Sequence, residues 1–328
     1  MKSGKVSDTV LNRSVLSEVA ETVPEALCPR VGGGAAQGFY GDLVSAVQTV
    51  TDEGVLTAYL AAVKAVNSLA AAQATPKFAD LAITVPEDLD ERDLRKMTER
   101  ACTYLAKQSV AVTGGHTAVS RCVSAPIVSV RMLGIQKTKL AQAGTETADW
   151  DVVMTKQCGF AGTALLAGHY KELLTKRYPE RFIERAAGLL EKVGNHTECA
   201  IAAQQGAVYA HAAGEGGIFG ALWELAEYMK CGLEIDLDAI PILQETVEIC
   251  EVFDINPYQL KTEGVFLFLT RHGARLCEML AAEQIPAAVI GKTVAGPDRA
   301  VRCRDEVRYL EPNRVEEYEN VQAKAAER

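Results

Sequence analysis

The regular alternation of strand-like and helix-like segments constrains the fold of this chain more than any other feature. In the first half, hydrophobic periodicity predicts strands near residues 43–50, 79–85, 109–113 and 127–134 and helices near residues 55–72 and 90–107. In the second half, the strands "DVVMTK", "LEIDL", "VFLFL" and "AAVIG" alternate with helices near residues 162–177, 179–191, 197–207, 218–230, 242–253 and 272–283. Such alternation is typical of α/β or α+β proteins.

A polar segment without periodicity, "QKTKLAQAGTETADWD", separates the two halves. The chain has 328 residues, and single hydrophobic cores stop growing near roughly 250 residues. We therefore predict two domains, an N-terminal α/β domain over residues 1–143 and a C-terminal α/β domain over residues 144–328. The second should hold a mixed sheet flanked by helices.

The composition excludes several classes of function. The chain is 48% hydrophobic and 23% charged, which is typical of a folded soluble protein. A net charge of -9 disfavours binding to nucleic acid, which needs clustered Lys and Arg. We see no leader and no run that approaches the roughly 18 apolar residues of a membrane span, so we expect a cytoplasmic protein. The nine cysteines form no C-x-x-C pair and should be reduced core residues.

Two familiar nucleotide motifs fail on inspection. In "VGGGAAQG", the G-x-G-x-x-G pattern that starts at Gly32 would need a third glycine where Gln37 stands. In "GKT" at residues 291–293, the first glycine of a P-loop would fall on Pro286. The chain therefore carries neither the dinucleotide fingerprint nor a P-loop.

The segment "TGGHTAVS" at residues 113–120 follows a short apolar strand. Paired glycines at a strand end expose backbone N–H groups, and His116 and Thr117 add a titratable ring and a hydroxyl. We expect a turn here that can hold an anion. A tight turn with a merely exposed histidine is the other interpretation, and it stays open.

The segment "GEGG" at residues 214–217 precedes a helix with an apolar stripe. A glycine-rich helix start presents N–H donors and the positive end of the helix dipole to a phosphate. Glu215 can instead cap those donors. Both interpretations stay open from the residues alone.

These segments together resemble the aminoimidazole ribonucleotide (AIR) synthetase superfamily, which includes the carbamoyl-dehydrating hydrogenase maturation factor, selenophosphate synthetase and thiamine monophosphate kinase. The similarity is most specific in "TGGHTAVS", "GEGGIFGALWELAE", "GLEIDLDAIPILQETVEICEVFDINPYQL", "AAVIGKT" and "VRYLEP". It implies an N-terminal domain that pairs across a dimer to build a β-barrel and a C-terminal domain that covers a cleft. In that family, ATP lies in the cleft, and carboxylates hold Mg²⁺ against its phosphates.

The resemblance also assigns roles to individual residues. Asp52 is expected to be a metal ligand and, with His116, a catalytic residue. The residues expected to bind the nucleotide are Gly32, Gly33, Gly34, Asn67, Gly114, Gly115, Thr117, His211, Glu215, Gly216 and Gly217.

Several acidic residues of the family pattern are absent. Glycines Gly33 and Gly34 stand where the family has carboxylates. The family's Asn-Asp pair becomes Asn67 followed by Ser68, and its His-Asp pair becomes His211 followed by Ala212. The cysteine that accepts the carbamoyl group has no counterpart either, because the last cysteine in the sequence is Cys303.

The resemblance and these departures lead to two functional hypotheses. The first is a weakly active or non-catalytic member that forms a homodimer or a heterodimer with an intact related subunit. The second is a working ATP-dependent enzyme that acts on an amide or carboxylate oxygen, with His116 near the γ-phosphate. In that case the replacement ligands would be Asp42, Asp52, Glu53 or Glu215.

Overall fold

The computed structural model describes residues 8–20, 31, 36–37, 41–136, 148–312 and 316–326. It divides into two compact units, of which one spans Gly34–Lys139 and the other combines Met1–Gly33 with Leu140–Arg328. We call them the N-terminal and C-terminal units. Gly32, Gly33 and Gly34, which the sequence assigns to the nucleotide, lie outside the described residues.

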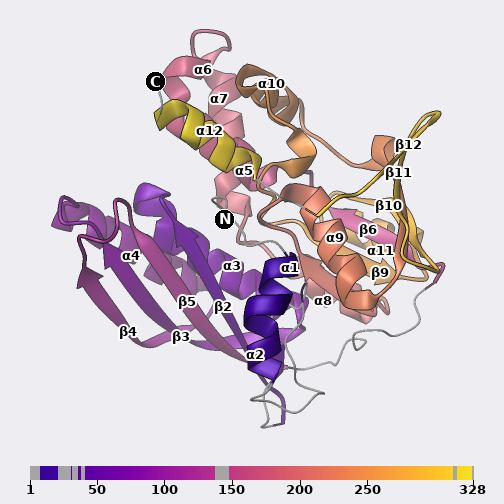
Figure 1. Cartoon of the computed structure of the whole chain (residues 1–328), viewed down its shortest axis with the longest axis horizontal. Helices are drawn as coiled ribbons and strands as arrows, with labels where there is room; N and C mark the ends of the chain where they lie inside the picture. Colours follow the sequence, from indigo (N-terminus) through magenta and orange to yellow (C-terminus); the bar gives the residue numbers. More distant parts are fainter. Residues whose placement is uncertain are drawn as a thin grey trace. The chain divides into compact units, whose positions relative to one another are not determined.

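The N-terminal unit is built on a five-stranded sheet in the order β1-β2-β5-β3-β4 (Figure 1). All pairings are antiparallel except that between β3 and β4, which is parallel. The parallel pair is joined by a helical crossover, as such pairs require. The strands are β1 (Ala36–Gln37), β2 (Leu43–Thr51), β3 (Ala74–Val85), β4 (Ala111–Val119) and β5 (Ile127–Gln136).

Two helices, α3 (Thr57–Ala71) and α4 (Glu91–Lys107), accompany this sheet. Helix α3 packs on strands β2, β3 and β5, and α4 packs on α3. Asp90 caps α4 by accepting a hydrogen bond from the Arg92 N–H at 2.7 Å. The other face of the sheet carries exposed residues such as Val47, Phe78 and Ile135. Among the described residues of a single chain the sheet is open, so the expected barrel does not close within it.

One sequence expectation needs correction in this unit. The segment Gly54–Ala71 is long and apolar enough to cross a membrane, with a mean hydropathy of 1.3, although no such run was expected. In this structure 78% of the segment is buried. Its small residues let α3 pack closely on the sheet, as in the core helix of a globular domain.

The C-terminal unit is built on a seven-stranded mixed sheet in the order β12-β11-β8-β10-β6-β9-β7. Only β8 and β11 are parallel neighbours in it. The strands are β6 (Asp151–Thr155), β7 (Tyr209–Ala212), β8 (Gly232–Asp236), β9 (Phe266–Thr270), β10 (Ala287–Val294), β11 (Arg299–Cys303) and β12 (Glu306–Tyr309). Strands β6 and β9 are almost wholly apolar and buried, which places the core at the centre of the sheet.

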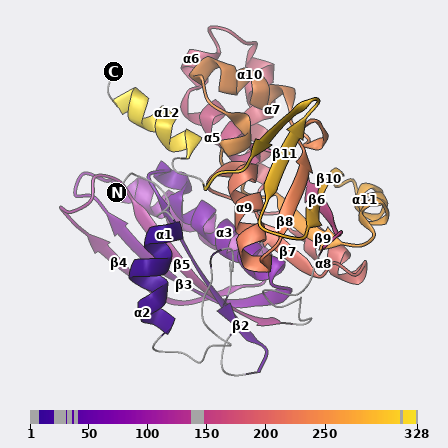
Figure 2. The ribbon, with the colours of Figure 1, turned by 45° about the vertical axis from the view of Figure 1, so that its right-hand side comes forward.

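Helices lie on both sides of this sheet, with α9 and α11 on opposite sides in Figure 2. Helix α11 packs with α8 against β6 and β10, while α5, α7 and α10 pack together. Near the start of the chain, the short helices α1 (Asp8–Leu11) and α2 (Ser17–Ala20) join this unit, and Trp223 donates to Asp8 Oδ2 at 2.8 Å. The other helices are α5 (Phe160–His169), α6 (Lys171–Leu174), α7 (Glu180–Gly188), α8 (Thr197–Gln204), α9 (Gly217–Met229), α10 (Gln244–Phe253), α11 (Gly273–Ala282) and α12 (Glu317–Ala326).

The predicted turn at "TGGHTAVS" is wrong, because β4 continues through it to Val119. Gly115 allows this, since its φ is +152° and a Cβ there would lie 2.0 Å from the Leu81 carbonyl oxygen. The cysteines that the structure describes are all free, and four of them are buried. Those four are Cys158, Cys199, Cys231 and Cys250.

Candidate functional site

The residues predicted on β4 do not share one face. Side chains alternate along a strand, so His116 and Thr117 point to opposite sides of the sheet. By register His116 lies beside Ala82, which pairs with Ser129 of β5. These three residues lie on the face of the sheet that α3 does not cover, which we call the open face. One phosphate therefore cannot be held by both His116 and Thr117 of one chain.

An ion pair occupies the open face beside Gly114. Arg131 contacts Asp80 Oδ2 at 3.0 Å, and Thr113 donates to Asp80 Oδ1 at 3.1 Å. A Cβ at Gly114 would lie 3.2 Å from the same Asp80 oxygen. Arg131 therefore balances the charge of the carboxylate that lies next to Gly114.

The acidic residues suggested as metal ligands in the N-terminal unit are dispersed. Asp42 precedes β2 and Asp52 follows it, so nine strand residues separate them, which corresponds to roughly 30 Å. Asp52 is exposed, whereas the adjacent Glu53 is only 1% exposed. The Glu53 N–H donates to Thr57 Oγ1 at 3.1 Å, at the start of the α3 segment. Asp42 and Asp52 of one chain cannot bind the same ion.

Asn67 and Ser68 both lie on α3 and are buried. The Ser68 hydroxyl donates to the Lys64 carbonyl at 2.9 Å and accepts from Gln48 Nε2 at 3.0 Å. Ser68 thus joins α3 to β2 through a neutral hydrogen bond. This is the position at which the resemblance implies an aspartate.

In the C-terminal unit, the glycine loop at residues 214–217 leads directly into α9. Gly216 is the N-cap residue with φ of 84°, and Gly217 follows with φ of +66°. A Cβ at Gly217 would lie 2.4 Å from the Tyr258 carbonyl oxygen. These glycines are needed because the chain takes a left-handed path against the turn at Pro257–Gln259.

His211 is buried on β7 and is engaged within its own unit. Its Nε2 lies 3.1 Å from Glu224 Oε2 of α9, and its Nδ1 lies 3.4 Å from the Tyr209 hydroxyl. Burial, the largest cause, raises the pKa of Tyr209 well above its usual value. The contact between His211 and Glu224 links β7 to α9, the helix that follows the glycine loop.

The segment at residues 256–264, which we call the central loop, forms hydrogen bonds with three other segments of the C-terminal unit. The Thr262 N–H donates to the Gly214 carbonyl at 3.1 Å, and Thr262 Oγ1 accepts from the Gly159 N–H at 2.9 Å. The Lys261 N–H donates to Glu316 Oε1 at 2.9 Å. The loop therefore contacts the glycine loop, the start of α5 and the start of α12.

Glu316 is the most perturbed acid described in this region. It is 4% exposed, and its Oε1 also accepts from the Tyr318 N–H at 3.2 Å. Burial raises the pKa of Glu316 to about 8, with Glu263 raising it further and Lys261 opposing the shift. At neutral pH Glu316 therefore carries a proton in a large part of the molecules.

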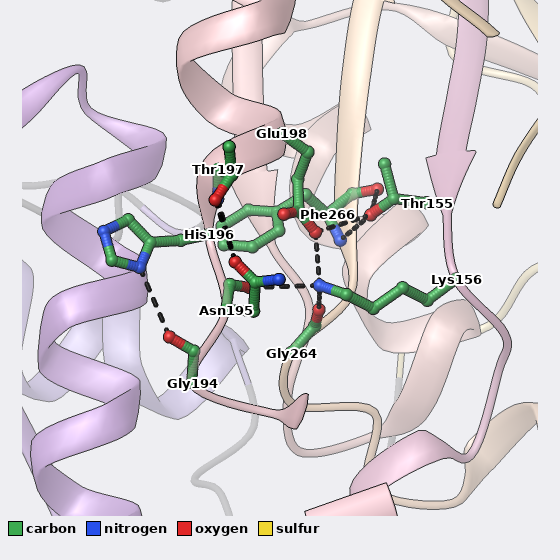
Figure 3. Close-up of polar contacts among 9 residues, drawn as sticks. All are labelled: Thr155, Lys156, Gly194, Asn195, His196, Thr197, Glu198, Gly264 and Phe266. Atoms are coloured by element: carbon green, nitrogen blue, oxygen red, sulfur yellow. Dashed lines mark hydrogen bonds and ion pairs between the residues drawn. The ribbon is translucent and has the colours of Figure 1, made fainter. Parts of the chain in front are cut away.

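A second buried cluster surrounds Lys156, directly after β6 (Figure 3). The Lys156 ammonium donates to Glu198 Oε1, to the Gly264 carbonyl and, at 3.0 Å, to the Asn195 carbonyl. Glu198 is fully buried on α8. Thr155 Oγ1 lies 3.4 Å from the same Glu198 oxygen and accepts from the Phe266 N–H at 3.0 Å. The lysine after β6 thus joins the start of α8 to the end of the central loop.

The Lys156 cluster and the contacts of the central loop were not predicted from the sequence, although residues 256–260 belong to a motif that carries the resemblance. A buried lysine is rare unless it is paired, but the sequence does not show that Lys156 is buried. For Glu316 there was no signal either, since its burial depends on where α12 docks. Within the residues that the structure describes, no group of three or more His, Cys, Asp or Glu side chains is arranged to hold a metal.

Comparison with known proteins agrees with this architecture. The N-terminal domain of AIR synthase related protein matches residues 25–136, and the C-terminal domain matches residues 147–304. Carbamoyl dehydratase HypE of Rhodobacter capsulatus is 28% identical over 246 residues, covering 73% of this chain and 70% of that protein. A putative hydrogenase expression/formation protein of Methanocaldococcus jannaschii is 26% identical over 214 residues, covering 65% of this chain and 62% of that protein.

Solved structures share the fold at lower identity. A HypE-HypF complex matches with a TM-score of 0.71 at 17% identity, covering 91% of this chain and 99% of that one. HypE in complex with ATP matches with a TM-score of 0.68 at 14% identity, covering 97% of both chains. AaThiL complexed with AMPPCP and TMP gives a TM-score of 0.69 at 17% identity, covering 94% of this chain and all (100%) of that one. With both domain models matched along its length, this chain belongs to the AIR synthase superfamily as a HypE-like, AIR synthase-related protein.

Proposed function

We propose that this protein retains the nucleotide-binding scaffold of its family, has lost most of the carboxylates that hold Mg²⁺ and ATP together, and is weakly active or non-catalytic. The observation that carries the proposal is Ser68. It stands where the family has an aspartate, and it is buried in a hydrogen bond to Gln48. A neutral side chain already committed to the sheet does not replace a metal-binding carboxylate.

The remaining acids support the same conclusion. Mg²⁺ needs several oxygen ligands at about 2.1 Å in near-octahedral geometry. In the N-terminal unit Asp42 and Asp52 flank opposite ends of β2, and Glu53 is buried beside the exposed Asp52. These residues do not fit a Mg²⁺ site within one chain, and we derive no chemical step through the metal.

ATP binding without a strong metal site is the expected residual activity. Relatives of the same fold are solved with ATP and with AMPPCP. We also keep the predicted domains, with residues 1–143 as the dimerisation and nucleotide domain and residues 144–328 as the second domain. We further keep, as a proposal, the nucleotide-binding residues that the sequence predicts. Those residues are Gly32, Gly33, Gly34, Asn67, Gly114, Gly115, Thr117, His211, Glu215, Gly216 and Gly217.

We further propose a dimer through the open face of the N-terminal sheet, either with a second copy or with a related subunit. Val47 is 60% exposed there and Phe78 49% exposed, which is unusual for large apolar side chains. A face-to-face dimer would close the sheets into the expected barrel. His116 lies on this face, so it would meet a nucleotide only where two subunits join.

One observation favours an active enzyme as the alternative function. Asp52 and Glu53 stand together directly before α3, so one of them could serve as a metal ligand if a partner supplied the others. The enzyme would then transfer phosphate from ATP to an amide or carboxylate oxygen of a small molecule or a protein terminus, in the cytoplasm. Sustained, Mg²⁺-dependent release of phosphate by the purified protein would favour this alternative.

The test is the melting temperature with ATP alone and with ATP and Mg²⁺. A ligand at 100 times its dissociation constant stabilises a protein by about 2.7 kcal/mol. We expect a small rise in melting temperature that is the same with and without Mg²⁺. A rise that appears only with Mg²⁺ would contradict the loss of the metal site.

A further inference from the structure

The Lys156 cluster has the composition of a cation site. Four oxygens face the buried ammonium or belong to its carboxylate partner: both oxygens of Glu198 and the carbonyl oxygens of Asn195 and Gly264 (Figure 3). Three of them accept the three N–H bonds that a lysine can donate. We call these four atoms the oxygen cage.

One oxygen of the cage is left over. Glu198 Oε2 is buried and makes no hydrogen bond within the described part of the chain. A lysine approaching from one side has no fourth donor to offer. A spherical ion at the same place would reach both Glu198 oxygens, because carboxylates bind such ions in mono- or bidentate fashion.

The backbone at Lys156 adds a separate observation. Its φ is 55°, in the left-handed region that costs energy for a residue with a side chain. The Lys156 N–H nevertheless donates to the Pro286 carbonyl at 2.7 Å, so the chain holds this conformation. A glycine at this position would relieve that backbone cost.

We propose that the Lys156 ammonium takes the place of a bound monovalent cation, and that the oxygen cage binds K⁺ or NH₄⁺ when this lysine is removed. Main-chain carbonyls and one carboxylate carry a single negative charge, which matches a monovalent ion. Carbonyl oxygens of this kind replace the hydration shell of K⁺ in other proteins. The tethered ammonium gives the same neutralisation without depending on the salt around the protein.

The test uses Lys156→Gly, which opens the cage and relieves the left-handed backbone. In choline chloride we expect its melting temperature to lie about 10 °C below that of the unchanged protein, because Glu198 is left buried without a partner. In KCl or NH₄Cl of equal ionic strength, we expect at least about 3 °C of that loss to return. The unchanged protein should differ by no more than about 1 °C among the three salts.

Two controls separate cation binding from general salt effects. Lys156→Met fills the space of the lysine stem and should show no selective recovery in KCl or NH₄Cl. The double variant K156G/E198Q lacks the charge of the cage and should not recover either. Equal melting temperatures of Lys156→Gly in all three salts, or recovery in the double variant as well, would overturn the proposal.

A variant that folds poorly still gives an answer. If Lys156→Gly folds only in KCl or NH₄Cl, the proposal is supported. If it stays unfolded in every salt, Lys156→Ala is measured in the same series, and the absence of a K⁺ or NH₄⁺ response in both variants rejects the cage. The readout involves no ATP, so its outcome is independent of the proposed function.

Discussion

The glycine-rich motifs of the two units lie in different settings, one at the start of a buried helix and the other in an exposed edge strand. In the C-terminal unit, Gly216 and Gly217 start α9 against the central loop, and a side chain at Gly217 would collide with the backbone of Tyr258. In the N-terminal unit, Gly114 lies in an exposed edge strand and faces only the side chain of Asp80. Its neighbour Gly115 instead resembles Gly217, because a Cβ there would lie 2.0 Å from the Leu81 carbonyl oxygen. Each motif therefore holds one glycine that the neighbouring backbone requires. The comparison teaches that a glycine pattern alone does not reveal which glycine is needed, because the neighbouring backbone decides it.

Among the variants considered below, Gly217→Ala should have the largest destabilising effect. Gly217→Ala places a Cβ 2.4 Å from a backbone oxygen at φ of +66°, and we expect it to lower the free energy of unfolding by roughly 4 kcal/mol. The matched control is Gly114→Ala, whose Cβ meets only a side-chain oxygen at 3.2 Å and should change it by less than about 1 kcal/mol. Urea unfolding of both variants measures this. If both variants lowered the free energy of unfolding by a similar amount, Gly217 and Gly114 would not differ in their packing as described above.

Glu316 should make stability depend on pH. Its pKa is about 8 in the folded protein against an ordinary value of 4.5, so between these values the folded state holds a proton that the unfolded chain releases. Stability must therefore fall as pH rises from about 4.5 to 8. We expect Glu316→Gln to remove that contribution, of the order of 5 kcal/mol over the full window.

The measurement for Glu316 is the free energy of unfolding at intervals from pH 5 to pH 9. The variant and the unchanged protein should converge at the acid end and separate toward the alkaline end, with the variant more stable. Glu317→Gln is the control, because Glu317 is the neighbouring acid in the first turn of α12. An unchanged pH slope in Glu316→Gln would show that α12 is not held by a protonated Glu316.

Ser68 offers a smaller test in the N-terminal unit. Ser68→Ala removes the hydrogen bond to Gln48 and should cost about 1 kcal/mol in thermal unfolding. If Ser68 has only this structural role, ATP affinity should stay the same in the variant. A loss of ATP affinity without a loss of stability would place Ser68 at the nucleotide.

His116 gives the smallest effect on stability. His116→Ala, on an exposed edge strand, should change the free energy of unfolding by less than about 0.5 kcal/mol. Its effect should instead appear in self-association or in ATP binding by the proposed dimer, which light scattering and titration can follow. A stability loss above that level would mean that His116 packs within its own chain.

The elements with a clear hydrophobic period could be predicted from the sequence. Strand β2 and helices α3 and α4 begin and end within a few residues of expectation, because one face of each meets the core. Strand β4 was cut short at its glycines, since the close approach to Leu81 that explains them is a tertiary contact. The segments of β7 and β12 are short, and their strands form only through pairing with neighbours.

The candidate site was harder to predict for the same reason. The sequence identifies the glycine loop at residues 214–217, but the partner of that loop is the central loop, some forty residues later in the chain. Lys156 and Glu198 are likewise joined only in the folded protein. The resemblance predicted which acids are missing, whereas the hydrogen bond between Ser68 and Gln48 could be found only in the structure.

Isothermal titration of ATP into the protein, with and without Mg²⁺, tests the central claim most directly. Because Ser68 and the dispersed acids do not form a metal site, we predict dissociation constants that agree within about threefold between the two conditions. A Mg²⁺-dependent tightening of tenfold or more, equal to about 1.4 kcal/mol, would contradict the account and would mean that the carboxylates of a working metal site are present.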